Sequence, residues 1–337
     1  MGTNPAVVFQ GLRQVAVEDV AMPAAGPGQL LIRTRKSLIS TGTELTVLGG
    51  DFPPEAGWAQ HTKFPLTPGY CNIGEVIAVG EGVDEAWLGR RVGTYGAHMA
   101  YVTAPPTLAR PVPDSIPDNH ATFFTISEIV MNGLRRSQVQ WGESVVVFGA
   151  GLLGQLVARY CRLCGARPVI VAEIADSRLQ RLPLSDPAIM PVNPRREDVG
   201  AAVRQATRGR MADLAFEVTG EPEVVRDGLA VLRRQGRLVV LSSPRGGACV
   251  DFHDLCNAPS YTIIGAHNSS TPPNETDGTP WTWQRHTELF FDLLASGEVS
   301  VEPLISHCEP YREAPGLYQM LLADRSPAMG VILDWTQ

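Results

Sequence analysis

The sequence lacks several features that define whole classes of proteins. No apolar run approaches the roughly 18 residues that a membrane-spanning helix needs. The opening MGTNPAVVFQ has neither the basic region nor the long apolar region of a secretory signal. No block of lysine and arginine stands out in a chain of net charge −7, which argues against a nucleic-acid or anionic-membrane surface. We therefore expect a cytoplasmic protein that acts on a small molecule.

Cysteine is also scarce, with six residues scattered over 337, which argues against a disulfide framework. Cys161 and Cys164 are spaced like half of a zinc knuckle, but no second ligand pair lies near them in the sequence. They share helical spacing with apolar residues such as Leu156 and Tyr160. Buried thiols behave as small hydrophobes, so we expect both cysteines to belong to the core.

The character of the sequence changes along its length and predicts two domains, since 337 residues exceed one typical core. Residues 1–124 hold short β-type runs between Gly- and Pro-rich turns, which predicts a mostly-β domain. Residues 125–265 alternate apolar runs such as VVVFG and PVIVAE with helical patterns, among them EPEVVRDGLAVLRRQG, a helix expected to end at Gly236. This segment predicts a doubly wound α/β domain with a parallel sheet. Residues 266–337 are expected to return to the first domain.

The stretch from Gly149 to Gly154, GAGLLG, is a G-x-G-x-x-G motif between a predicted strand and a predicted helix. Gly149 allows the tight turn, Gly151 lets the backbone approach a pyrophosphate, and Gly154 lets the helix lie close to the strand. Glu173 ends the next apolar run, where a carboxylate binds ribose hydroxyls and repels a 2′-phosphate. The motif therefore predicts a dinucleotide site that favours NAD(H), while Arg178 leaves NADP(H) open.

Over essentially its full length the chain resembles the medium-chain dehydrogenase/reductase superfamily, of the zinc alcohol and sorbitol dehydrogenase type. The shared stretches are PGYCNIGEVIAVGEGV, GRRVGTYG, GAGLLG, FEVTG, GRLVVLSSPRG and SPAMGVILDW. The resemblance implies an NAD(P)-dependent enzyme with a GroES-like catalytic domain and a Rossmann domain. The expected cofactor-binding residues are then Gly149, Gly151, Leu152, Leu153, Gly154, Glu173, Arg178, Thr219, Leu241, Ser242, Ala266 and Asn268.

The chain departs from its zinc-containing relatives at the metal. Their Cys-Gly-x-Asp motif corresponds to TGTE here, with Thr41 in place of the cysteine, and their Gly-His-Glu corresponds to GYC, with Tyr70 in place of the histidine. Thr125 stands at the third ligand position, and the four-cysteine lobe of structural zinc is missing. Zinc prefers thiolate, imidazole or carboxylate ligands, so we expect no zinc. Cys71 and Glu128 are nearby substitutes in the sequence, but two ligands without a third make a poor site. ISTGTE and PLTPGY resemble a zinc-less branch that includes bacteriochlorophyllide hydroxyethyl dehydrogenases and sugar-pathway oxidoreductases.

Without a metal, a side chain must exchange the proton of the substrate oxygen. Tyr70 is the first candidate, since a phenol can hydrogen-bond an oxyanion, but it can equally be a packing residue. Thr43 matches the family's proton-relay position or is a turn hydroxyl, and Thr41 offers a second hydroxyl. His267, after the run YTIIGA, is either an acid/base or polar lining. Four polar residues have no assigned role: Glu44, His61, Lys63 and His98, the last in a segment resembling a surface strand.

The sequence thus predicts a zinc-independent, NAD(H)-dependent oxidoreductase that interconverts a secondary alcohol and a ketone and functions as a homodimer. Its substrate would be a sugar, a cyclitol or a biosynthetic natural-product intermediate. Two alternatives stay open: an NADPH-dependent quinone or enoyl reductase, and a non-catalytic dinucleotide-binding protein.

Overall fold

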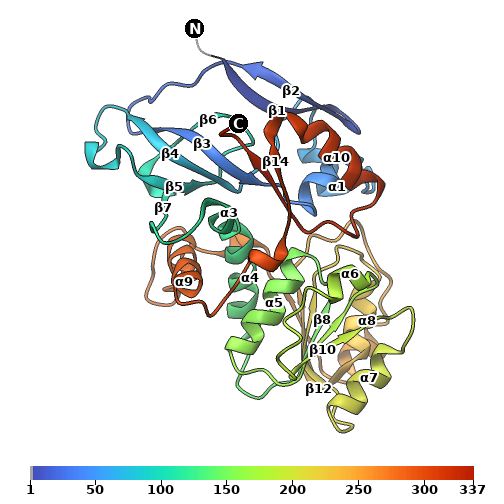
Figure 1. The fold of residues 1–337 in the computed structure, drawn as a ribbon. Coiled ribbons are helices and arrows are strands. Elements are labelled where there is room, and N and C mark those ends of the chain that lie inside the picture. The colour runs from blue at the N-terminus through green and yellow to red at the C-terminus, as the bar shows by residue number, and fades with distance from the viewer. Residues whose placement is uncertain (1–2) are drawn as a thin grey trace. The chain divides into compact units, whose positions relative to one another are not determined.

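The computed structural model describes residues 3–337, except for the side chain of His61. His61, one of the polar residues noted in the sequence, therefore lies outside the described side chains. The chain forms two compact units (Figure 1). The first contains the residues up to Ile126 together with Gln284–Gln337, and the second is the continuous segment Ser127–Trp283. Within residues 3–337, none of the helices has the length and apolar character needed to cross a membrane.

The first unit is built on a seven-stranded, mostly antiparallel sheet in the order β14-β15-β3-β4-β5-β7, with β6 paired to β3. A separate hairpin pairs β1 with β2. The strands are β1 Asn4–Gly11, β2 Gln14–Val20, β3 Leu30–Leu38, β4 Asn72–Val79, β5 Arg91–Thr94, β6 Tyr101–Ala104, β7 Arg110–Pro111, β14 Ile305–Pro310 and β15 Gly330–Asp334. The helices are α1 Thr43–Gly49, α2 Gly57–His61, α3 Asp118–Ala121, α9 Trp283–Ala295 and α10 Ala314–Ala323. The mostly-β architecture predicted for this part of the chain is confirmed.

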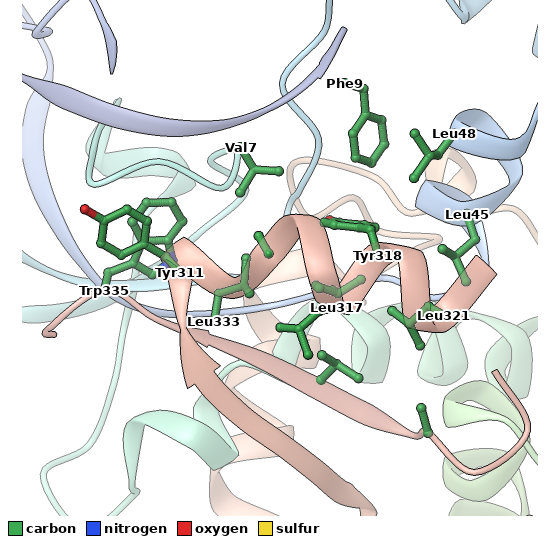
Figure 2. Close-up of a cluster of buried hydrophobic side chains, with 14 residues drawn as sticks. Val7, Phe9, Leu45, Leu48, Tyr311, Leu317, Tyr318, Leu321, Leu333 and Trp335 are labelled. Atoms are coloured by element: carbon green, nitrogen blue, oxygen red, sulfur yellow. The ribbon is translucent and has the colours of Figure 1, made fainter. Parts of the chain in front are cut away.

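Helix α10 packs into the core of the first unit through one apolar face (Figure 2). Tyr318 of this helix lies edge-on to Phe9 of β1, with ring centroids 5.1 Å apart. Leu317 and Leu321 of α10 belong to the same buried cluster, together with Leu45 of α1. Burying each such side chain contributes about 1.5–3 kcal/mol, so the C-terminal part of the chain is part of the first unit's core.

The second unit contains a six-stranded sheet in the order β10-β9-β8-β11-β12-β13, and every neighbouring pair is parallel. This is the strand order 3-2-1-4-5-6 of a Rossmann fold, which confirms the predicted α/β class. The strands are β8 Val145–Phe148, β9 Val169–Ala172, β10 Ile189–Val192, β11 Ala212–Glu217, β12 Leu232–Val240 and β13 Thr262–Gly265. The helices are α4 Phe124–Ser137, which begins in the first unit, α5 Leu152–Leu163, α6 Asp176–Leu179, α7 Val199–Ala206 and α8 Val224–Ala230.

Some sequence predictions for the second unit need correction. The helix expected to end at Gly236 ends at Ala230, because Leu232 already pairs with Ala212 in the sheet and Gly236 lies inside β12. Cys161 is buried as expected, whereas Cys164 is exposed because it follows the last residue of α5.

The segment 266–283 belongs to the second unit, whereas the sequence assigned it to the first. Asn132 of α4 donates hydrogen bonds to the carbonyls of Ala266 and His267, at 3.4 and 3.0 Å. The Arg135 guanidinium lies 3.3 Å from the ring centre of Trp281. These contacts hold the segment against α4 of the second unit.

Candidate functional site

The three glycines of the GAGLLG loop, between β8 and α5, are required for different reasons. Gly149 has a φ of +103°, which favours glycine, and a methyl group on Gly154 would lie 1.9 Å from the Gly149 carbonyl oxygen. Gly151 differs, because its φ of −68° suits any residue and a methyl group there would meet nothing within 4 Å. Nothing in the chain itself requires glycine at this position. A pyrophosphate lying against the loop does require it, so the loop fits a dinucleotide.

Glu173, just after β9, is a buried carboxylate beside this loop. Its Oε2 accepts a hydrogen bond from the Ala150 N–H at 2.8 Å, and its Oε1 accepts one from the Ala175 N–H at 3.0 Å. The Arg178 guanidinium lies 3.7 Å from Oε2. Glu173 and Arg178, the two residues expected to decide between NAD(H) and NADP(H), therefore lie together beside this loop. Of the two other predicted loop residues, Leu152 is buried and Leu153 half-buried at the start of α5.

The other predicted cofactor residues lie after the remaining strands. Thr219 follows β11, Leu241 and Ser242 follow β12, and Ala266 and Asn268 follow β13. The carboxyl ends of parallel strands lie at one edge of the sheet, so all five stand along the edge where open α/β sheets bind ligands.

His267 is exposed and its ring is used locally. Its Nδ1 lies 2.7 Å from the Ser269 hydroxyl and accepts the Ser269 N–H at 3.2 Å. The ring therefore caps its own 3₁₀ turn, Asn268–Ser270, and this supports the polar-lining alternative for His267.

Tyr70 and Thr43, both predicted catalytic residues, are brought together in the first unit. The Tyr70 hydroxyl donates to Thr43 Oγ1 at 3.3 Å and shares a short hydrogen bond with the Ser40 hydroxyl. Burial raises the pKa of Tyr70, and neighbouring Cys71 and Glu44 add to the effect, whereas the Ser40 and Thr43 hydroxyls oppose it. The phenol is therefore protonated at neutral pH and can donate a hydrogen bond, although its raised pKa makes it a weaker acid than an ordinary tyrosine. Thr41 is half-buried in the turn before α1.

Behind this cluster lies the buried carboxylate of Glu44, which sequence reasoning left without a role. Its Oε1 accepts the Ser40 N–H at 2.9 Å, and Tyr318 of α10 donates a short hydrogen bond to Oε2. His98 Nε2 lies 3.3 Å from both oxygens. His98 is completely buried, so the expectation of a surface segment at this position is wrong. Glu44 thus fixes the backbone of Ser40, whose hydroxyl in turn holds Tyr70.

Comparison with known proteins shows similarity to a family of dehydrogenases. The model of the zinc-binding dehydrogenase family matches residues 153–280. L-threonine 3-dehydrogenase of Pyrococcus horikoshii is 29% identical over 321 residues, which cover 86% of each chain. The chain is similar to zinc-type dehydrogenases of the medium-chain dehydrogenase/reductase superfamily. This similarity agrees with the NAD(P)-dependent oxidoreductase predicted from the sequence.

Solved structures share the whole fold with this chain. 2R,3R-butanediol dehydrogenase from Bacillus subtilis superposes with a TM-score of 0.80 at 21% identity, covering 98% of this chain and 99% of that one. A short-chain alcohol dehydrogenase from Escherichia coli CFT073, in complex with NADH, has a TM-score of 0.80 at 18% identity, covering 99% and 100%. At these identities the likeness establishes the fold.

The zinc that the name of the matching family implies does not fit the donors of this chain. At the three ligand positions stand the neutral hydroxyls of Thr41, Tyr70 and Thr125, and zinc prefers thiolate, imidazole or carboxylate. The Thr125 hydroxyl donates to the Tyr70 carbonyl at 2.9 Å, and the raised pKa of Tyr70 disfavours a phenolate ligand. Among the residues that the structure describes, no three His, Cys, Asp or Glu side chains gather where they could hold a metal ion.

Proposed function

We propose that this protein is a zinc-independent, NAD(H)-linked oxidoreductase that interconverts a secondary alcohol and a ketone, with Tyr70 exchanging the proton of the substrate oxygen. The observation that carries the proposal is the Tyr70 phenol, which occupies a zinc-ligand position of the family between the hydroxyls of Ser40 and Thr43. A hydroxyl cluster replaces the metal donors at this position.

The arrangement supports acid catalysis in the direction of ketone reduction. NADH held by the second unit would supply the hydride, and Tyr70 would donate its proton to the oxygen that becomes negative. The Ser40 hydroxyl can donate to the phenolate oxygen that remains, since the two oxygens already share a hydrogen bond. Thr43, also in contact with the phenol, is placed to return a proton. In alcohol oxidation the same groups act in reverse.

For the cofactor we propose NAD(H), because a 2′-phosphate beside the Glu173 carboxylate would bring like charges together in a partly desolvated site. The second candidate, an NADPH-linked quinone or enoyl reductase, is supported by Arg178, whose guanidinium lies within 3.7 Å of that carboxylate. Released from Glu173, Arg178 could pair with the 2′-phosphate instead.

For the substrate we propose a secondary alcohol carried on a sugar, a cyclitol or another biosynthetic intermediate. The names of two similar proteins support the class, because L-threonine and 2R,3R-butanediol both carry secondary hydroxyls. A homodimer in the cytoplasm is part of the same proposal.

Metal analysis combined with turnover tests this function. The purified protein is expected to hold well under one zinc per chain and to reduce a panel of ketones with NADH at a rate that chelators do not change. About one zinc per chain, retained through mild chelation, would overturn the metal-free proposal and make Cys71 or Glu128 a ligand. Reduction of enones or quinones with NADPH, but of no ketone, would favour the second candidate.

A further inference from the structure

Glu217, the last residue of β11, has a completely buried carboxylate that joins two turns. Its Oε1 accepts hydrogen bonds from the N–H and the hydroxyl of Thr219, both at 2.6 Å, and from the Gly220 N–H at 3.0 Å. Its Oε2 accepts a short hydrogen bond from the Ser242 hydroxyl, after β12. The Glu217 carbonyl also accepts the N–H groups of Leu241 and Ser242, at 3.1 and 3.2 Å. One residue therefore holds the turns after two neighbouring strands.

The position of Glu217 is costly for a carboxylate. The preceding residues of β11, Leu214, Ala215 and Phe216, are apolar and completely buried, as suits a strand covered on both faces. A buried carboxylate there loses its hydration and needs donors at both oxygens to offset the loss. The donors come from turn residues, and Gly220 among them has a φ of +79°, a conformation that few other residues adopt. The hydrogen bonds thus fix the shape of these turns.

The position of these two turns, at the carboxyl ends of β11 and β12, indicates their function. Strand order reverses between β8 and β11, and dinucleotides bind across the carboxyl ends of the strands at such a point. The glycine loop and Glu173 follow β8 and β9, on the half that takes the adenosine. Thr219 and Ser242 follow β11 and β12, on the other half, where the nicotinamide end must lie.

We propose that Glu217 is a positioning residue for the nicotinamide half of the cofactor, acting through Thr219 and Ser242 without touching the cofactor itself. The inference rests on dinucleotide binding as part of the proposed function, and it does not depend on the role of Tyr70.

The test compares two ligands that differ only in the nicotinamide end. Glu217→Gln keeps the size of the side chain and removes the charge that strengthens all four hydrogen bonds. We expect its Kd for NADH to rise about tenfold, while its Kd for ADP-ribose, which lacks the nicotinamide, stays within about twofold of wild type. The matched control, Glu173→Gln, is expected to weaken both ligands by a similar factor, because it alters the shared adenosine end.

Hydrogen exchange of the ligand-free protein provides a second readout. In Glu217→Gln, exchange should quicken in residues 218–222 and 241–245 and stay unchanged in residues 149–155. Unchanged exchange in the two turns, equal loss of both ligands or wild-type NADH affinity would each overturn the proposal. If Glu217→Gln does not fold, Glu217→Asp, which keeps the charge but draws it back by one methylene, must show the same selective loss of NADH. A wild-type protein that binds neither ligand would refute the dinucleotide premise, and the proposed function with it.

Discussion

Replacing Tyr70 with phenylalanine removes one oxygen atom from the hydroxyl cluster and leaves the ring in place. That oxygen contacts the hydroxyls of Ser40 and Thr43, which can still bond to solvent or to each other, so the fold should survive. A general acid typically contributes about 10²- to 10⁴-fold, so kcat for ketone reduction should fall by that factor. The fall corresponds to about 3–5 kcal/mol in the activation barrier. The Kd for NADH should not change, because the expected cofactor residues all lie in the second unit.

The assay follows oxidation of NADH with any surrogate ketone that the wild type reduces, and a parallel titration gives the Kd for NADH. The pH profile adds an independent check, because burial raises the pKa of Tyr70 above the ordinary value of 10.0. An acid with a raised pKa keeps its proton as pH rises, so kcat for reduction should stay level to about pH 10 and fall only beyond it. Thr43→Val, the control, should cost less than Tyr70→Phe. A kcat within about threefold of wild type in Tyr70→Phe would refute the reasoning and leave the phenol as a packing residue.

Three further outcomes are expected. The protein should bind NADH about 10- to 100-fold more tightly than NADPH by nicotinamide fluorescence, and equal affinities would mean that Arg178 binds the 2′-phosphate. Gly151→Val should abolish NADH binding and leave the melting temperature nearly unchanged, because its side chain enters open space, whereas Gly154→Ala should lower the melting temperature by several degrees. A Gly151→Val protein that still binds NADH would exclude close approach of the pyrophosphate. Tyr318→Phe removes a donor from the buried Glu44 carboxylate and should cost about 1–3 kcal/mol of unfolding free energy in denaturant titrations, and no loss would mean that Glu44 does not need this donor.

Local patterns in the sequence were sufficient for the second unit's architecture. Continuous apolar runs mark strands covered on both faces, and the glycines of GAGLLG mark the turn between β8 and α5. The same patterns failed at the end of α8, because Val231 and Leu232 suit a buried helix face as well as a strand. Pairing of Leu232 with Ala212 decides the matter, and that contact lies outside any local window.

The polar network around Tyr70 could not be predicted for a related reason. Glu44, His98 and Tyr318 come from α1, a loop before β6 and α10, so their proximity depends on the completed fold. The segment of His98 resembled a surface strand, and no periodicity signals that its ring is enclosed. The network around Glu217, in contrast, could have been predicted from the sequence. A carboxylate at the end of the apolar run in FEVTG needs hydrogen-bond donors if it is buried.

The first unit is assembled from two segments that lie far apart in the sequence, and this sets the order in which the units can fold during synthesis. The second unit is one continuous segment, so it can fold while the ribosome is still translating residues beyond Trp283. The N-terminal strands must wait, because β15 pairs with β3 and Tyr318 reaches Glu44 only after α10 and β15 have been translated. Until then the nascent chain exposes the apolar surface that α10 later covers, including Phe9 and Leu45. Translation that stops between Trp283 and α10 would therefore leave the second unit attached to an unfinished first unit, a target for chaperones and proteases.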